Sequence, residues 1–166
     1  MSDAPVQIGP TTEGGLLVRL VGRCTMQHSP AVEELVGQSL ARDPTVSAWV
    51  DLTACTYLDS TFLGCLFGLY RRFGTGPAPR FHLHIEPAQM KALFGPMRLD
   101  KVVRADPAAM PDPAGPLTPI GDAPPDRKAL CRHVMECHRR LAETDTPAKV
   151  AFTKIADAME QELAQL

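Results

Sequence analysis

Aromatic side chains are scarce in this sequence: they make up 5% of the residues and include a single tryptophan, Trp49. Surfaces that bind single-stranded nucleic acid stack bases on several such rings, so the scarcity argues against that class. The formal net charge is -2 and the pI is near 6.2. Nucleic acids and anionic membranes select clustered Lys and Arg instead. These absences exclude nucleic acid as an expected partner and favour proteins.

Long apolar runs are missing as well. No stretch approaches the roughly 18 to 20 consecutive apolar residues of a membrane span, and the start MSDAPVQIG lacks the basic and apolar regions of a signal peptide. We therefore expect a cytoplasmic protein without direct membrane insertion. The five cysteines form an odd count without a paired framework, in a chain too large to need disulfides, so we expect reduced thiols.

Proline divides the chain. A length of 166 residues fits one main domain with a small additional element. Composition changes at Ala105, and the proline-rich stretch that follows cannot continue as a helix or a central strand. We predict a domain at 1–105, an extended linker at 106–125 and a helical element at 126–166. The linker prolines are Pro107, Pro111, Pro113, Pro116, Pro119, Pro124 and Pro125.

Hydrophobic patterns in residues 1–105 predict an α/β domain. Extended runs at 6–9 and 16–22 flank the turn-rich PTTEGG and indicate a hairpin. The order of elements is then β-β-α-β-α-β-α-β, which implies a mixed β-sheet with helices packed on it. The later elements are a helix from the cap Ser29-Pro30 through Ala41, a strand centred on Trp49 to Leu52 and followed by the turn TYLD, a helix from residues 59–61 to Gly74, a strand in RFHLHIE, a helix in PAQMKALFGPM and a strand in KVVRA.

The C-terminal element has apolar residues at helical spacing on both sides of the turn ETDTP, which predicts a helical hairpin. A hairpin with so few apolar residues cannot bury much surface alone. We expect it to dock on the main domain or on a second subunit, the latter giving a homodimer through these helices. The residues expected to be buried in this way are Leu130, Val134, Leu141, Ile155 and Met159.

In YLDSTFLG the chain passes from strand to helix through Asp59, Ser60 and Thr61. Such residues are common helix caps, and capping by Asp59 or Ser60 would explain them without any function. A helix N-terminus also presents free N–H groups and a positive dipole, which would accommodate a phosphate on Ser60. That phosphate adds roughly 1.5 to 2 negative charges and would repel a partner suited to a neutral hydroxyl. The residues alone leave cap and switch both open.

The runs LLVRLVGRCTMQHSPAVEELV and VDLTACTYLDSTFLGCLFGLYRRF, with the order of elements, resemble the STAS family, named for sulfate transporters and anti-sigma factor antagonists. The resemblance covers roughly residues 5–105. In the antagonists, an Asp-Ser-Ser-Gly-Leu-Gly motif follows the third strand, and a partner kinase that is also the anti-sigma factor phosphorylates the first serine. The corresponding positions here are the strand-end acid Asp51, the motif aspartate Asp59, the phosphorylated serine Ser60, and the Leu63-Gly64 step; Thr61 replaces the second serine and Phe62 the usual glycine.

The resemblance implies a bacterial, non-enzymatic phosphoprotein that regulates transcription. Unphosphorylated Ser60 would permit docking to an anti-sigma factor serine kinase, which then releases a sigma factor, and phosphorylation would block that docking. Thr61 is the second candidate phosphorylation site. The implied partner-binding residues are Asp59, Phe62, Gly64 and Gly68.

Several alternatives stay open. Phe62 is either a buried core residue or an exposed partner anchor, and Gly64 with Gly68 would equally suit close internal packing. Arg71 and Arg72 suit the C-terminal helix dipole as solvated caps. A second function is a STAS-like subunit of a membrane lipid ABC transporter that binds its ATPase. A third is a ligand-sensing module.

Catalytic and metal motifs give little support to other functions. The sequence has no convincing glycine-rich phosphate loop, Ser-His-Asp order or paired carboxylates, so we expect neither an enzyme nor a cofactor. CRHVMECH offers Cys131, His133, Cys137 and His138, but only His133 and Cys137 share the four-residue spacing. Without a second cluster nearby, ordinary helix packing is preferred over a metal site.

Overall fold

A mixed β-sheet forms the centre of the molecule, as the sequence predicts. The computed structural model describes residues 3–121, 123 and 125–166, so Pro124 of the predicted linker lies outside the described residues. Within these residues one sheet has the order β4-β3-β2-β1-β5. β2, β3 and β4 run parallel, and β1 is antiparallel to both of its neighbours. The strands are β1 (Val6–Pro10), β2 (Leu16–Cys24), β3 (Ala48–Leu58), β4 (Phe81–His84) and β5 (Thr118–Pro119).

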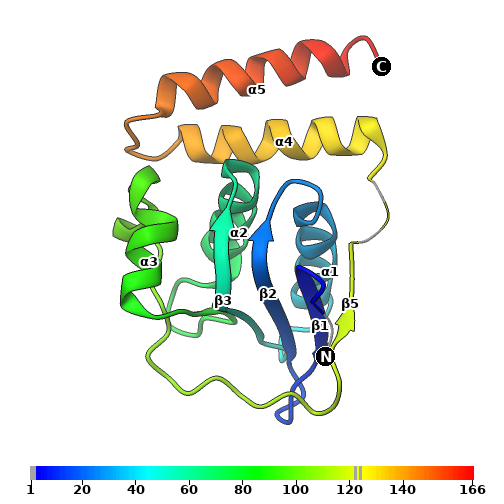
Figure 1. Cartoon of the computed structure of the whole chain (residues 1–166), viewed down its shortest axis with the longest axis vertical. Helices are drawn as coiled ribbons and strands as arrows, with labels where there is room; N and C mark the ends of the chain where they lie inside the picture. Colours follow the sequence, from blue (N-terminus) through cyan, green and yellow to red (C-terminus); the bar gives the residue numbers. More distant parts are fainter. Residues whose placement is uncertain (1–2, 122, 124) are drawn as a thin grey trace.

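Two layers of helices accompany the sheet (Figure 1). Helices α1 and α2 lie behind the sheet, and α3 lies at its β3 side. Helix α4 crosses the end of the sheet where β2 and β3 finish and α2 begins, and α5 lies outside α4. The helices are α1 (Ser29–Arg42), α2 (Ser60–Phe73), α3 (Pro87–Phe94), α4 (Arg127–Ala142) and α5 (Lys149–Leu163).

The core lies between the sheet and helices α1 and α2. Phe62, in the first turn of α2, is fully buried there, which settles its place as a core residue in this conformation. Burial on this side explains the broad apolar face of α2, since a helix pressed between a sheet and another helix must be apolar around most of its circumference. The largest fully buried side chains include Phe62, Phe81, Phe94, Leu66 and Leu69.

Three local predictions were wrong. KVVRA does not form a strand: the chain makes a 3₁₀ turn at Leu99–Lys101 after Arg98, whose φ of 56° is left-handed. This five-residue segment has one pair of adjacent large apolar residues, Val102 and Val103, and only Val103 is buried in the core. So short a pattern does not specify a strand. The predicted turn TYLD mostly belongs to β3, which continues to Leu58. Ser29 does not cap α1, because its hydroxyl faces helix α4 instead.

The proline-rich segment is extended, and it packs along the sheet. Its residues pair with β1 at the sheet edge, with Ile8 opposite Thr118, and the Ala114 N–H donates to Pro10 O at 2.8 Å. An edge position suits a proline-rich strand, since each proline lacks one N–H. This path carries the chain from the main sheet to the start of α4 (Figure 1).

The C-terminal helices form the predicted hairpin, and it docks on the chain's own α/β domain. Val134 and Leu141 are buried as expected, whereas Leu130 and Met159 are only half-buried. Ile155, however, is 37% exposed, so its predicted burial was wrong. Helix α5 packs on α4 through Phe152 and Ala156, and this turns Ile155 away from the contact.

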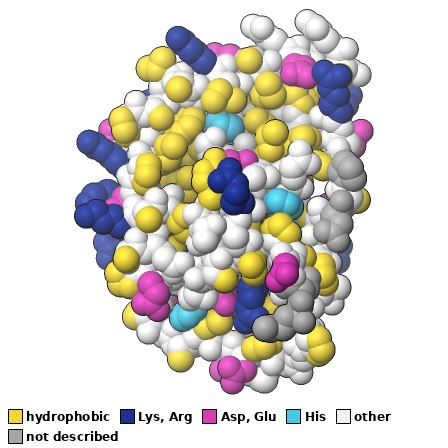
Figure 2. Space-filling view, in the orientation of Figure 1, with side chains coloured by type: hydrophobic (Ala, Val, Ile, Leu, Met, Phe, Trp, Pro, Cys, Tyr) yellow, Lys and Arg dark blue, Asp and Glu magenta, His cyan; other side chains and the backbone are white. Residues whose placement is uncertain are grey.

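The surface carries both signs of charge and some apolar side chains. Figure 2 shows acidic and basic side chains distributed over the visible face, with hydrophobic side chains in its upper half around α4. Among the described residues, no helix has both the length and the apolar character needed to cross a bilayer.

Removing the Phe62 ring should test its central place in the core. We expect Phe62→Ala to lower the free energy of unfolding by about 3 to 5 kcal/mol, because it leaves a large cavity at a fully buried site. Urea denaturation followed by circular dichroism measures this change. Val150→Ala, at a side chain that is 68% exposed, is the control and should change stability by less than about 0.5 kcal/mol. Equal effects of the two substitutions would contradict this placement of Phe62.

Candidate functional site

Asp59 caps helix α2, so the capping interpretation of this residue is confirmed. One carboxylate oxygen, Oδ1, accepts the N–H of Phe62 at 2.8 Å. The other, Oδ2, accepts the N–H of Met26 at 2.6 Å, in the turn between β2 and α1. The carboxylate therefore joins two chain segments and stays fixed directly beside Ser60.

Ser60 is the first residue of α2, and its hydroxyl contacts helix α4. The Ser60 Oγ lies 2.9 Å from Nε2 of His138, and the other ring nitrogen, Nδ1, lies 2.7 Å from the carbonyl oxygen of Val134. Because a carbonyl only accepts, Nδ1 carries the proton of the neutral ring and Nε2 accepts from the serine hydroxyl. Ser60 is half-buried, whereas Thr61 is 3% exposed, so Ser60 has the more accessible hydroxyl.

His138 is held firmly in its position. Its side chain is buried, and its ring packs edge-on against Phe152 of α5, with 5.5 Å between ring centroids. Burial lowers the pKa of His138 below the ordinary value, which favours the neutral ring that the hydrogen bond from Ser60 requires.

The two small residues of α2 face the same helix. A Cβ added to Gly64 would lie 2.5 Å from the carbonyl oxygen of Cys137, and one added to Gly68 would lie 2.9 Å from Nη1 of Arg140. Close internal packing therefore accounts for both glycines. In this conformation Phe62, Gly64 and Gly68, three of the implied partner-binding residues, are covered by other parts of the chain, while Asp59 lies at the edge of the cover.

A second polar cluster joins α4 to α1. The hydroxyl of Ser29 lies 2.8 Å from Nε2 of His133, and Nδ1 of the same ring lies 2.7 Å from Oε2 of Glu33. Arg140 forms an ion pair with Glu33 as well. Burial would raise the pKa of Glu33, but the hydrogen bond from His133 and the positive charge of Arg140 outweigh it and lower that pKa. The cluster fixes α4 against α1 through a charged carboxylate.

This cluster could not be predicted from local sequence patterns, because Ser29 and His133 are 104 residues apart. The order serine, histidine, carboxylate is the one used for nucleophilic catalysis. Ser29, however, has no exposed surface, so a substrate has no access to its hydroxyl in this arrangement. The geometry supports a structural contact between helices.

A metal could be considered at the same place. Ligand atoms of Glu33, His133 and Cys137 all lie within 4.8 Å of one another. Glu33 and His133 already pair with each other, and Arg140 brings a positive charge to the carboxylate. Burial also raises the pKa of Cys137, which favours the thiol over the thiolate that binds metals. The helix-packing interpretation therefore remains the better account of these residues.

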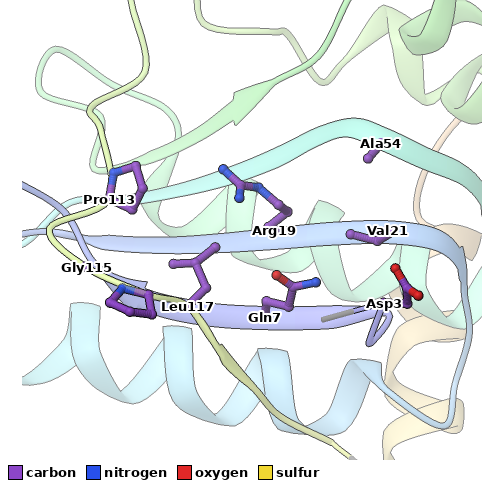
Figure 3. A pocket seen from close by; sticks show the side chains of 9 residues that line it. Asp3, Gln7, Arg19, Val21, Ala54, Pro113, Gly115 and Leu117 are labelled. Carbon is purple, nitrogen blue, oxygen red and sulfur yellow. The ribbon is translucent and has the colours of Figure 1, made fainter. Parts of the chain in front are cut away.

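Among the hollows lined by described residues, two bear on the residues singled out above. One, of about 330 Å³, lies between helices α4 and α5 and Met26, whose N–H donates to Asp59; its apolar lining includes Met26, Leu130 and Met159. The other, of about 580 Å³, lies between the sheet and the proline-rich segment (Figure 3). Arg19 points into it from β2, but its Nε lies 3.2 Å from Oδ2 of Asp51, so the guanidinium is already paired.

Asp51, the strand-end acid of the resemblance, has a structural role here. Its Oδ1 accepts from both the N–H and the hydroxyl of Thr53, at 3.0 and 2.6 Å, while Oδ2 faces Arg19. Arg71, expected as a solvated helix cap, pairs with Glu143 just after α4.

The sequence matches no protein-family model, and it matches no curated protein. The geometry at Ser60 and the motif around it are therefore the features that point to a function.

Acid should weaken the docking of α4 through His138. Its pKa is lowered chiefly by burial, an effect that nearby His133 increases and the charge of Asp59 opposes. The neutral ring therefore contributes stability above the ordinary pKa of 6.5, and this contribution is lost as the pH falls below that value.

We expect the melting temperature of the wild type to fall between about pH 7 and about pH 5. His138→Gln keeps a side-chain acceptor near Ser60 but does not titrate, so its melting temperature should fall less over this range. Thermal melts of both proteins in matched buffers give the comparison. Identical pH dependence would show that His138 does not contribute.

Proposed function

We propose that this chain is a non-enzymatic regulator resembling anti-sigma factor antagonists. It binds an anti-sigma factor that is also a serine kinase, and phosphorylation of Ser60 controls the binding. The proposal combines the STAS-like motif around residues 59–64 with the observed position of Ser60 at the start of α2.

The observation that carries the proposal is the geometry of the helix start. Ser60 is the first residue of a 14-residue helix, and the Asp59 carboxylate beside it is fixed by two backbone N–H groups. The helix N-terminus provides a positive dipole for a phosphate on Ser60. Thr61 lies in the same turn but is buried, which makes it the weaker candidate.

Phosphorylation of Ser60 would control partner binding by changing the charge at this site. A serine hydroxyl is neutral, whereas phosphoserine adds roughly 1.5 to 2 negative charges at pH 7. Those charges would lie next to the Asp59 carboxylate and repel any partner suited to the unmodified surface. Beside this site, Met26 is 39% exposed and lines the apolar hollow of 330 Å³, so the surface offers an apolar contact for a protein partner.

The test is phosphorylation by the cognate anti-sigma kinase with ATP, followed by peptide mass mapping. We expect phosphate on Ser60 in the wild type, none at residues 59–61 in Ser60→Ala, and retained phosphate on Ser60 in the matched variant Thr61→Ala. Phosphate found only outside residues 59–61 would contradict the proposal.

A pull-down with unmodified protein separates the proposed function from its nearest alternative. The antagonist function predicts recovery of an ATP-binding serine kinase, and prior phosphorylation should reduce that recovery. Recovery of a transporter ATPase subunit, unaffected by Ser60→Ala, would instead support a role in a membrane lipid transporter.

A further inference from the structure

We propose that the α4–α5 hairpin is an autoinhibitory cover over Ser60, and that a phosphate on Ser60 and the docked hairpin exclude each other. This inference rests on the proposed function insofar as it takes Ser60 as the phosphoacceptor. It adds a regulation of that site by the chain's own C-terminal helices.

Phosphorylation requires that the kinase reach the Ser60 hydroxyl. Phosphoryl transfer forms a bond between Ser60 Oγ and the γ-phosphorus of ATP, breaks the bond from that phosphorus to the bridging oxygen of ADP, and passes the hydroxyl proton to a base of the kinase. The Oγ must therefore face the nucleotide. In the docked state it donates to Nε2 of His138 on α4 at 2.9 Å. The hydrogen bond to His138 must therefore break, and we expect the hairpin to move before the transfer.

The space between the Ser60 hydroxyl and the docked helix α4 is small. With the Ser60 hydroxyl in its present orientation, a phosphoryl group on Oγ would lie against Nε2 of His138, where only a direct hydrogen bond now fits. The ring cannot easily turn aside, because Val134 holds Nδ1 and Phe152 packs against the ring. The backbone of α4 cannot approach from another angle either, since Cys137 already lies against Gly64. Removing this steric conflict requires α4 to move away from α2.

The charges around Ser60 also disfavour a phosphate in the docked state. In the unmodified protein, burial lowers the pKa of His138 and favours its neutral form, so the docked ring holds a lone pair and no positive charge toward Ser60. The Asp59 carboxylate, fixed next to Ser60, adds a second negative charge. The α2 dipole favours a phosphate that is open to solvent, but it does not remove the steric conflict with α4.

In this proposal the hairpin leaves as one unit, and Cys137, Leu141 and Phe152 leave the core with it. Its two helices have ion pairs of their own, from Arg139 to Asp157 and to Glu160 and from Arg127 to Glu162. Polar contacts with the α/β domain come from a few side chains that can part without breaking those pairs. They include His138 with Ser60, His133 with Ser29 and Glu33, Arg140 with Glu33, and Glu143 with Arg71.

Release would expose the face of α2 that carries Gly64 and Gly68, which the resemblance implies as partner contacts. The unmodified protein would therefore bind its partner only while the hairpin is undocked, and in the phosphorylated protein the added charge beside Asp59 still repels the partner from the exposed face. Phosphorylation and hairpin docking are then linked equilibria, so each must weaken the other by the same factor. The docked α4–α5 hairpin slows phosphorylation of Ser60, and a phosphate on Ser60 keeps the hairpin undocked.

The buried cysteines provide a direct test. Phosphoserine is placed at position 60 during translation with a phosphoserine-inserting suppressor system, so no kinase is needed. N-ethylmaleimide labelling and peptide mass mapping then give the reaction rate of each thiol. Cys137 reports undocking, Cys131 reports separation of α4 from α5, and Cys24 with Cys55 reports unfolding of the sheet.

We expect phosphoserine at 60 to speed the labelling of Cys137 on the order of tenfold, within the usual range of coupling between sites. Rates at Cys24 and Cys55 should stay unchanged. An unchanged rate at Cys137 would overturn the cover, and so would equal acceleration at Cys24 and Cys55, because the phosphate would then destabilise the whole domain. Failure of any kinase to modify Ser60 would contradict only the proposed function.

A glycine pair tests docking without altering Ser60. Gly64→Ala places a Cβ against the Cys137 backbone and should speed labelling of Cys137, whereas Gly37→Ala in α1 meets no atom closer than 3.9 Å and should not. With the cognate kinase, Gly64→Ala should also accept phosphate on Ser60 faster than the wild type. Slower or equal phosphorylation of a Gly64→Ala protein with exposed Cys137 would contradict the covering role.

Discussion

The close approach of α4 to the first turns of α2 determines how the parts of this protein are arranged. Gly64 has no side chain, so the backbone of α4 at Cys137 can lie directly on α2. That approach brings His138 within hydrogen-bonding distance of Ser60 and Arg140 onto Glu33. A Cβ at position 64 would push α4 outward, and both contacts would lengthen together. A candidate phosphorylation site and a helical cover thus depend on one glycine.

Polar contacts between α4 and the α/β domain include buried and half-buried side chains, some of which can change charge. Burying a carboxylate is costly unless it is paired, and Glu33 is paired with both His133 and Arg140. A neutral His138 accepts from Ser60 in a site with little solvent. Such contacts define a single docked position well. They also respond to protonation or phosphorylation, which an interface of aliphatic side chains would not.

The proline-rich segment influences this arrangement through its path. Pairing with β1 keeps it on the sheet, so α4 starts close to the domain it covers. A short tether raises the local concentration of the hairpin at its docking surface, and a released hairpin would return readily. Modification of Ser60 would be needed to prevent that return, in keeping with the proposed coupling.

Much of the fold could be predicted from the sequence. Local hydrophobic periods and capping residues, which act over a few positions, predict the β1–β2 hairpin, the alternation of strands and helices, the start of α2 after Asp59 and the two C-terminal helices. KVVRA and Ile155 were misjudged because a short apolar run does not say whether the core has room for it. The candidate phosphorylation site came from the motif alone.

Only the tertiary structure decided what covers that site. Ser60 and His138 are 78 residues apart, and Ser29 and His133 are 104 apart, so no local pattern could pair them. Their meeting depends on the packing of α4 across α1 and α2, which is set by shape at Gly64 and by the paired, half-buried charge of Glu33. The sequence by itself determined a hydroxyl at a helix start. Packing between distant segments decided that this hydroxyl is held by a histidine of the chain's own C-terminal helix.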